Sequence, residues 1–285
     1  MTDYTVVNFA NVIPPVIPGE DLKTFGGLGS FEHYIEIQYR DTQQLLEKLE
    51  RGRRECDPHL SQEYKEAMRP IMVITCWGEA QTASQIAQIL TKCNIPKVQY
   101  YLCTHALDET RHTQIEWRRI TDLGLATELN VPREQTDLFR FVNSLPSYIE
   151  ALYGQVCMLE GYSANVLFRA IADLAEKNGD LATAATYEHV MHDETRHIST
   201  GIKLVKEEIA RDPDLNTWRI LELEPKILPI LIRKLGRDSA IAKALYNAGL
   251  IEDRAAFEQR GFDLYMKIRQ MVGLPEREMK LEDYV

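Results

Sequence analysis

Cysteine is scarce in this chain, and the few cysteines present do not indicate a disulfide-stabilised architecture. The five thiols are odd in number and scattered, without a Cys-x-x-Cys spacing: Cys56, Cys76, Cys93, Cys103 and Cys157. Proteins held together by disulfides carry cysteines in even numbers and at regular spacings, and they occur in oxidising compartments. We therefore expect reduced thiols in a cytoplasmic protein.

Long hydrophobic runs and clusters of basic residues are also missing. The longest apolar runs, such as Ile227–Ile232, are far too short to span a bilayer. The N-terminus has neither a basic region nor a long apolar stretch, so we expect no secretory signal. No basic cluster offsets the formal net charge of -10. This charge argues against a nucleic acid or an anionic membrane surface as a partner.

Strand-like patterns are absent as well, and most of the glycines and prolines fall between long helical patterns. We predict a nearly all-α chain in one domain, 1–285. Its parts are an extended arm (Met1–Ser30), a helix (Phe31–Arg54), four long helices (Gln62–Lys92, Pro96–Leu123, Tyr148–Ala175, Leu181–Ala210) and shorter helices (Thr217–Lys234, Ala240–Ala248, Asp253–Val272). The four long helices form a core at about 62–210, between N-terminal (1–61) and C-terminal (211–285) segments.

The connections between the long helices predict how they pack. The first two are joined by little more than Asn94–Pro96, and the last two by Lys177–Asp180. Short connections force antiparallel neighbours. The stretch Gly124–Ser147 between the hairpins is long enough to cross over along the bundle. Two hairpins and one long crossover predict a ferritin-like four-helix bundle.

The pentapeptide Asp-Glu-Thr-Arg-His occurs twice, at Asp108–His112 and at Asp193–His197. Each copy places a glutamate and a histidine one helical turn apart on the same face. One such pair is common on solvated helices, but two identical copies lie here on otherwise apolar stripes. A carboxylate and an imidazole from each of two facing helices make half of a carboxylate-bridged di-iron or di-manganese site.

The hairpin geometry locates the carboxylates that would complete this site. Glu109 lies thirteen residues into its helix, roughly 20 Å from the turn, and Glu79 lies at a matching depth before the turn. Glu160 and Glu194 match in the same way in the second hairpin. A single glutamate in an apolar stripe could bend to solvent or pair with an arginine. Four carboxylates buried together require cations.

Two divalent metals, four carboxylates and two neutral imidazoles bring the formal charge of the site to zero. The candidate ligands are Glu79, Glu109, His112, Glu160, Glu194 and His197. Metal-bound histidines commonly donate their other N–H to a carboxylate. Asp108 and Asp193 are placed to accept these bonds, and Arg111 and Arg196 are placed to pair with the aspartates. Exposed salt bridges along the helices are the alternative for these four residues.

Asp-Glu-x-Arg-His, occurring twice, resembles the motif of the hydroxylase α subunits of bacterial multicomponent monooxygenases, which oxidise methane, toluene, phenol and alkenes. The spacings of 30 residues from Glu79 to Glu109 and 34 from Glu160 to Glu194 are also similar. The resemblance covers about Gln62–Ala210. It implies two iron ions bridged by carboxylates, activation of O2 and insertion of one oxygen atom, with the same six ligands.

The chain departs from this pattern in three ways. It is shorter than those α subunits and lacks their large C-terminal region. Ala164 replaces a threonine that is thought to assist proton delivery to bound oxygen. Glu116 stands where the related small subunit of class I ribonucleotide reductase usually has its radical tyrosine, which makes that function unlikely for this chain.

Glu116 has two interpretations, as an additional carboxylate near the metals that tunes charge or binds an amine, or as a polar residue at the end of the stripe. Its counterpart after His197 is Gly201. Small residues around the predicted site leave a substrate-sized void or simply permit close packing: Ala83, Gly161, Ala164 and Gly201. Tyr153 and Tyr187, on the ligand faces, fit the core better than a redox relay.

The leading hypothesis is a di-iron oxygenase or oxidase acting on a small organic substrate, with O2 as co-substrate. We expect an external electron donor, a reductase or ferredoxin, and a homodimer; Mn/Fe or Mn/Mn pairs suit the same ligands. A related N-oxygenase acting on an amine is the alternative. Such enzymes usually carry a further histidine one turn before the last glutamate, where this chain has Val190, although His105 is a possible substitute. Metal storage and a partner subunit of a larger hydroxylase are alternatives of another class.

Overall fold

The computed structural model describes residues 31–125, 131 and 133–284, without the side chains of residues 31–33, 35 and 163–165. The predicted arm Met1–Ser30 lies outside this part of the chain. Contacts divide the chain into two units, with the boundary between residues 42 and 43. The helix α2 (Phe31–Glu55) contains this boundary.

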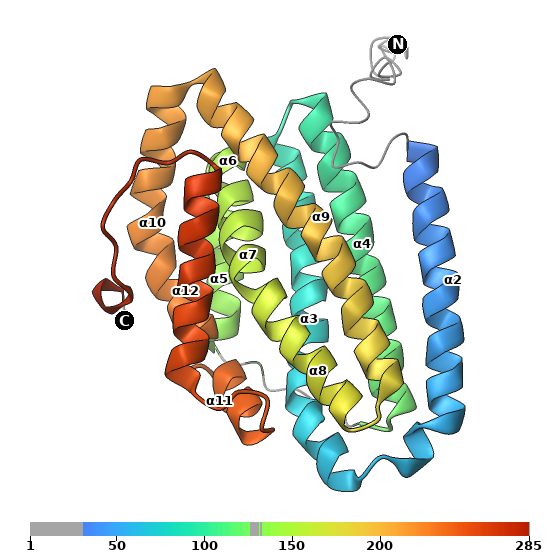
Figure 1. Ribbon diagram of the computed structural model, residues 1–285. Helices are drawn as coiled ribbons and strands as arrows, with labels where there is room; N and C mark the ends of the chain where they lie inside the picture. The colour runs from blue at the N-terminus through green and yellow to red at the C-terminus, as the bar shows by residue number, and fades with distance from the viewer. Residues whose placement is uncertain (1–30, 126–130, 132, 285) are drawn as a thin grey trace, which may run out of the picture. The chain divides into compact units, whose positions relative to one another are not determined.

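The second unit consists of helices, and its described residues contain no strand (Figure 1). After the short η2 (Asp57–His59), the chain forms α3 (Gln62–Lys92), α4 (Pro96–Asp122), α5 (Arg133–Ser144), a composite helix from Tyr148 to Lys177, α9 (Leu181–Arg211), α10 (Pro213–Leu235), α11 (Ala240–Asn247), α12 (Arg254–Met271) and the short η5 (Leu281–Asp283). The all-α ferritin-like prediction is confirmed. The four long helices agree with their predicted bounds to within two residues.

Two antiparallel hairpins form because the turn residues stop one helix and start the next. At the first turn Pro96 occupies the start of α4, where a proline costs no hydrogen bond. At the second, Gly179 takes the positive φ of 76° that a tight turn needs. The Asp180 side chain then caps α9 by accepting a hydrogen bond from the backbone N–H of Thr183 at 2.9 Å.

A buried ion-pair network fixes the two hairpins against each other at this end. The Arg119 guanidinium donates to Asp57 and Asp180, both at 2.6 Å, and to the Thr183 hydroxyl at 2.8 Å. The Tyr64 hydroxyl donates to the second oxygen of Asp180 at 3.0 Å. The network joins α3, α4 and the turn before α9, and so sets the depth at which residues of the two hairpins meet.

The third long helix is not a regular α-helix. It passes through α6 (Tyr148–Leu152), the π-helical segment η3 (Tyr153–Glu160), α7 (Gly161–Ser163), a second π-helical segment η4 (Ala164–Phe168) and α8 (Arg169–Lys177). In a π-helix the backbone bonds run to the fifth residue, so side chains five apart come together. Gln155 accordingly donates to Glu160 at 3.1 Å. The sequence pattern did not predict this distortion.

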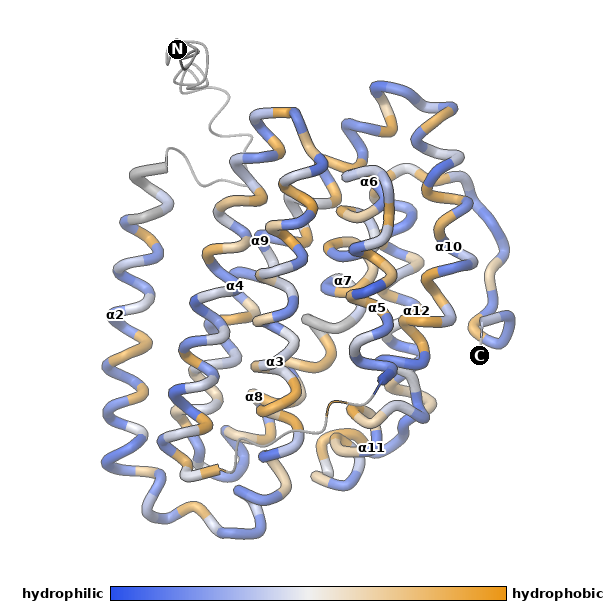
Figure 2. Tube along the Cα trace, turned by 180° about the vertical axis from the view of Figure 1, so that it is seen from behind, coloured by the Kyte–Doolittle hydropathy of each residue, from blue (hydrophilic) through white to orange (hydrophobic). Residues whose placement is uncertain are grey.

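The crossover and the C-terminal segment cover the bundle with further helices. The predicted crossover stretch contains α5, which contacts α3 and α10. The helix α10 also packs against α6 and η3, α11 contacts α3, and α12 packs against α7. Figure 2 shows hydrophobic and hydrophilic residues alternating along these helices, as expected for amphipathic segments that each bury one face.

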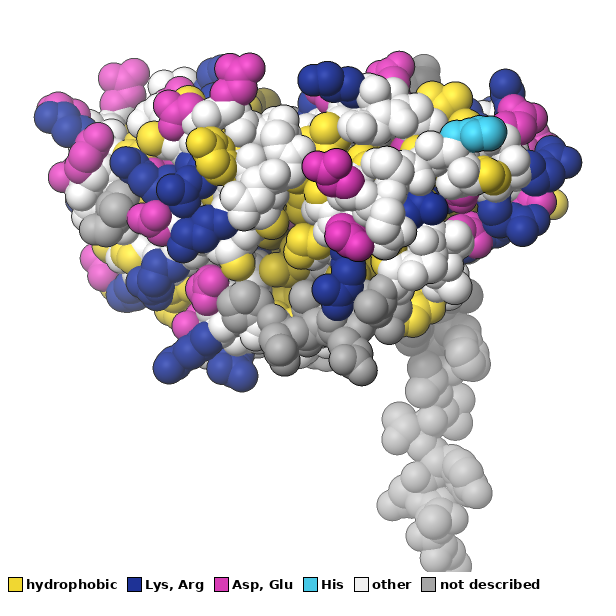
Figure 3. All heavy atoms as spheres, turned by 90° about the horizontal axis from the view of Figure 1, so that it is seen from below, with side chains coloured by type: hydrophobic (Ala, Val, Ile, Leu, Met, Phe, Trp, Pro, Cys, Tyr) yellow, Lys and Arg dark blue, Asp and Glu magenta, His cyan; other side chains and the backbone are white. Residues whose placement is uncertain are grey.

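The surface agrees with the charge pattern of the sequence. Figure 3 shows acidic and basic side chains interspersed over one face of the molecule, so no basic patch covers the described part of that face. Among the described residues, no helix combines the length and the hydropathy that crossing a membrane requires. The five cysteines are free thiols, of which only Cys103 is exposed.

Candidate metal centre

The structure brings all six predicted ligands together in the interior. Glu79 comes from α3, Glu109 and His112 from α4, Glu160 from the end of η3, and Glu194 and His197 from α9. All six are buried. Together with His105, the six residues form two groups, and within each group the ligand atoms lie within 4.8 Å of one another. One group is Glu79, Glu109, His112 and Glu194, and the other is His105, Glu160 and His197.

Both histidines turn their Nδ1 atoms toward the carboxylates. His112 Nδ1 lies 3.2 Å from Glu79 Oε2 and 3.8 Å from Glu194 Oε1. His197 Nδ1 lies 3.2 Å from Glu109 Oε1 and 3.6 Å from Glu194 Oε2. Glu109 Oε2 also lies 3.8 Å from His112 Nδ1, so Glu194 and Glu109 both lie between the two imidazoles.

The histidine of each Asp-Glu-Thr-Arg-His copy forms a hydrogen bond with the aspartate of the other copy, across the bundle. His112 Nε2 lies 3.1 Å from Asp193 Oδ2, and His197 Nε2 lies 3.2 Å from Asp108 Oδ2. An ionised aspartate only accepts hydrogen bonds, so each imidazole donates its Nε2–H, and Nδ1 is the nitrogen that faces the glutamates.

The arginine of each copy completes the exchange. Arg111 pairs with Asp193, and Arg196 pairs with Asp108. None of the four side chains is more than 14% exposed. The arrangement is therefore an internal reciprocal network rather than the exposed helix salt bridges considered as the alternative.

His105 belongs to the centre as a seventh candidate ligand. Its Nε2 lies 3.1 Å from both Glu109 Oε1 and Glu160 Oε1, and its ring stacks on His197 with centroids 3.7 Å apart. It is completely buried. The sequence suggested His105 only as a substitute ligand; the structure gives the group around Glu160 a second imidazole.

Several polar atoms of the centre have no hydrogen-bond partner in the described structure. They include Glu160 Oε2, Glu194 Oε2 and His197 Nδ1. With the Nε2 proton of His197 directed to Asp108, its Nδ1 lone pair faces the lone pairs of Glu109 at 3.2 Å. Two acceptors so close are unfavourable unless a cation or a proton lies between them. In the metal-free protein a proton on Glu109 would lie between these two atoms, and the residues fit a cation that displaces it.

Two of the carboxylates, Glu109 and Glu194, are held in an environment that disfavours their charge. Burial, followed by the charge of Glu79, raises the pKa of Glu109 well above its ordinary value. Burial and the neighbouring carboxylates Glu109 and Glu160 do the same for Glu194. Without metal these groups must hold protons, which divalent cations would displace on binding. Carboxylate oxygens with imidazole nitrogens suit iron or manganese.

Glu116 joins neither ligand group. It is fully buried and accepts a hydrogen bond from the Thr75 hydroxyl at 2.9 Å, while Thr75 also lies 2.7 Å from the Tyr187 hydroxyl. Burial and then the charge of Glu79 raise the pKa of Glu116 well above its ordinary value. Tyr153 bonds Glu224 on α10 and so belongs to the core.

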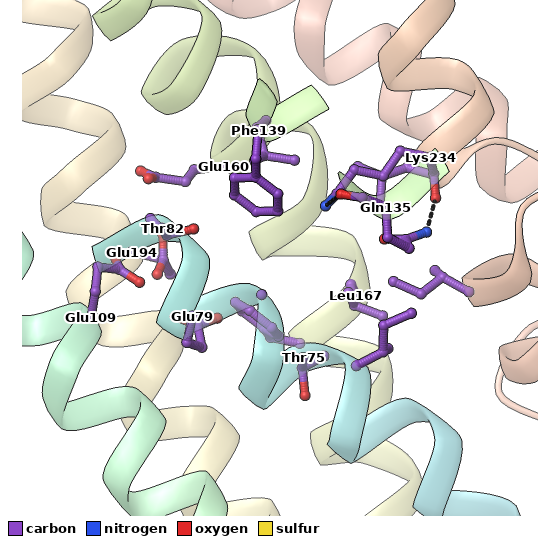
Figure 4. A pocket seen from close by; sticks show the side chains of 16 residues that line it. Thr75, Glu79, Thr82, Glu109, Gln135, Phe139, Glu160, Leu167, Glu194 and Lys234 are labelled. Carbon is purple, nitrogen blue, oxygen red and sulfur yellow. Dashed lines mark hydrogen bonds between the residues drawn. The ribbon is translucent and has the colours of Figure 1, made fainter. Parts of the chain in front are cut away.

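A cavity of about 60 Å³ adjoins the four carboxylates (Figure 4). Its walls combine the ligands Glu79, Glu109, Glu160 and Glu194 with Ile74, Thr75, Gly78, Thr82, Gln135, Phe139, Leu159, Leu167, Phe168, Lys234, Leu235 and Ile241. In Figure 4, Phe139 stands between Glu160 and the pair Gln135–Lys234. The helices α5, α10 and α11 thus close a space that begins at the candidate ligands.

The cavity does not lie where small residues suggested a void. Neither Ala83 nor Gly201 lines it, and the side chain of Ala164 lies outside the described residues. A Cβ added to Gly201 would overlap the Val156 side chain, so the glycine allows η3 to approach α9 closely. A Cβ at Gly161 would overlap Ile268 of α12. These small residues permit packing, which was the alternative interpretation.

Sequence reasoning missed the cavity residues of α5, α10 and α11. One signal was available for Lys234. It follows Ile227 and Leu231 at the spacing of a single buried stripe, and all three are buried. A charged residue on an apolar stripe is the same signal that located Glu79.

No protein-family model and no curated protein matches the sequence. Solved structures do. Toluene 4-monooxygenase, with toluene bound in its resting active site, matches with a TM-score of 0.66 and 14% identity over 77% of this chain and 75% of that chain. Xenon-pressurized phenol hydroxylase from Pseudomonas sp. OX1 matches with a TM-score of 0.60 and 15% identity over 97% of this chain. This chain spans 60% of that hydroxylase chain. At these identities the likeness shows a shared fold.

Proposed function

We propose that this protein binds two iron ions and uses O2 to oxidise a small organic substrate. The ligands would be Glu79, Glu109, His112, Glu160, Glu194 and His197. The observation that carries the proposal is the convergence of unpartnered lone pairs, above all His197 Nδ1, on buried carboxylates. The fold shared with two oxygenases of small aromatic molecules supports the same class of reaction.

Bound in this centre, two iron ions would supply the redox chemistry and the open coordination positions needed to activate O2 and oxidise a C–H or N–H bond. The chain itself positions the reactants. Asp108 and Asp193 hold the two imidazoles in the tautomer that leaves Nδ1 free for a metal. Phe139, Leu159 and Leu167 give part of the cavity wall an apolar surface that a hydrocarbon group can contact.

Insertion of one oxygen atom from O2 consumes two electrons and two protons and releases the other atom as water. The cysteines show no paired arrangement that could store electrons, so we expect a reductase or ferredoxin to deliver them. We also propose that the protein is a homodimer. Iron storage instead predicts a hollow shell of many subunits, which a mass measurement in solution would reveal.

Metal analysis and O2 uptake test the proposal together. After anaerobic loading and removal of excess metal, the wild-type chain should retain two metal ions, and the reduced protein should consume O2. Glu109→Ala and His197→Ala should lower the metal content and abolish O2 uptake. Glu188→Ala, which removes an exposed carboxylate of the same helix α9, is the matched control and should change neither. Retention of clearly fewer than two ions by the wild type would reject the dinuclear centre.

One observation favours N-oxidation of an amine as a second candidate. His105 places a third imidazole beside Glu109 and Glu160, and an additional histidine is a feature of the N-oxygenase alternative. Product analysis with an arylamine and with the corresponding hydrocarbon separates the two reactions, since N-oxidised and C-hydroxylated products differ in mass and retention. Loss of N-oxidation alone in His105→Ala would favour the second candidate.

A further inference from the structure

We propose, on the basis of the function above, that the substrate is a small organic anion whose acid group binds the ammonium of Lys234 while its apolar part faces the carboxylates of the metal centre. The proposal rests on the position of Lys234 in the cavity wall, on its surroundings and on the lining between it and the candidate ligands.

Lys234 is a buried cation with no acidic partner among the residues that the structure describes. The residue is 5% exposed. Its Nζ donates one hydrogen bond, to the backbone carbonyl of Gln135 at 3.2 Å, and no carboxylate of the described residues lies within ion-pairing distance. An ammonium has three donors. Two of them therefore remain for a ligand.

The other neighbours of the ammonium are aromatic rings. Nζ lies 4.1 Å from the centroid of Phe139 and 5.8 Å from that of Trp77. Ring faces stabilise a cation but do not replace its hydrogen-bond acceptors. Burial alone lowers the pKa of Lys234 to about 7. A buried charge is normally paired, because its desolvation is costly. An anion entering the cavity would supply the negatively charged partner that the described residues do not provide.

The lysine is held in place rather than free to reach solvent. The side chain of Gln135 donates to the backbone carbonyl of Lys234 at 2.9 Å (Figure 4). Lys234 Nζ donates back to the backbone carbonyl of Gln135. This reciprocal pair joins α5 to α10. It keeps the ammonium beside Phe139, on the cavity side of both helices.

The polarity of the cavity orients such a ligand. Glu79, Glu109, Glu160 and Glu194 line one part and Lys234 another, with Phe139 between them in Figure 4. The remaining wall is mostly apolar: Ile74, Leu159, Leu167, Phe168, Leu235 and Ile241. An acid group is attracted by the ammonium of Lys234, so the hydrocarbon part of the ligand faces the carboxylates at the other part of the cavity. The volume of about 60 Å³ favours a small molecule.

Ligand binding by paired probes tests this assignment. Propionate and propionamide have nearly the same shape and suit a cavity of about 60 Å³, but only propionate is charged. Calorimetry with metal-free wild-type protein should give propionate a preference of about tenfold or more, the range expected for a charge-assisted hydrogen bond. Lys234→Met should abolish the preference, and Lys234→Arg should retain it. Lys226→Met, the same change at an exposed position of α10, should leave it intact.

Equal binding of propionate and propionamide by the wild type, no binding of either, or a preserved preference in Lys234→Met would overturn the assignment. If Lys234→Met does not fold, the wild type and Lys234→Arg still decide the outcome through the same ratio. Repeating the titration with metal-loaded protein separates an acid group bound at Lys234 from one bound directly to metal, which Lys234→Met would not affect. Metal content, determined on the same samples, tests the proposed function independently.

Discussion

Replacement of Lys234 by methionine offers a quantitative test of the structure that does not depend on activity. Methionine keeps most of the aliphatic volume and removes the ammonium. Burial lowers the pKa of Lys234 to about 7 from an ordinary 10.5. Between these values the unfolded chain binds one proton that the folded chain does not. The free energy of unfolding of the wild type therefore rises with pH across this window, by about 1.4 kcal/mol per pH unit.

The variant lacks this proton, so the difference between the two proteins carries the signal. At pH 7 and below, Lys234→Met avoids the cost of a buried ammonium and loses only one hydrogen bond and two cation–π contacts, worth roughly 3 kcal/mol together. The full linkage amounts to roughly 5 kcal/mol. We therefore expect the variant to be the more stable protein at pH 7. Its advantage should fall by about 3 kcal/mol between pH 7.5 and 9.5.

Urea unfolding of the metal-free proteins at several pH values, followed by circular dichroism, measures this difference. Contributions from the glutamates of the metal centre are common to both proteins and cancel to a first approximation. Lys226→Met, at an exposed position, should show a difference from wild type that does not change with pH. If the difference for Lys234→Met were equally flat, the ammonium would be hydrated or paired, and the inference about its role would lose its basis.

Further predictions follow from other parts of the structure. Asp193→Asn and Asp108→Asn should each weaken metal affinity by about 10- to 100-fold, measured by titration against a chelator; an unchanged affinity would mean that the aspartates do not orient the imidazoles. Gly201→Ala should lower the free energy of unfolding by about 1–3 kcal/mol because its Cβ overlaps Val156, whereas Gly78→Ala, with open space at its Cβ, should raise it by up to about 1 kcal/mol. Arg119→Met should cost about 3–5 kcal/mol, because it leaves Asp57 and Asp180 buried without their partner; a loss below 1 kcal/mol would show that the network is hydrated.

The helices and the candidate ligands were predictable because each depends on local rules. The rise per residue of a helix is constant and short turns enforce antiparallel pairs, so counting from the turns was enough to match Glu79 with Glu109 and Glu160 with Glu194. The first residues of α3 and α4 also follow from local rules, because Ser61 caps the start of α3 and Pro96 stands at the start of α4. These features need no knowledge of which helices meet.

The cavity was not predictable from such rules because its walls come from separate parts of the chain. Phe139 lies in the crossover, and Lys234 and Ile241 lie in the C-terminal helices. Only packing brings them beside Glu160. The π-helical segment that ends at Glu160 is also invisible in the sequence, because the fifth-residue bonds of η3 depend on tertiary contacts rather than on local periodicity.

The repeated motif suggests two equivalent halves, and the structure shows where the equivalence ends. Asp108 and Asp193, with the histidines they hold, are related by exchange across the bundle. One turn before the first motif, however, stands His105, and one turn before the second stands Val190. The group around Glu160 therefore contains two imidazoles and one carboxylate, whereas the other contains three carboxylates and one imidazole. Two metal ions bound in these groups would be surrounded by ligands of different total charge, because carboxylates neutralise the charge of an ion and neutral imidazoles do not. The asymmetry that matters for chemistry is thus the one at His105, while Gly201 serves packing.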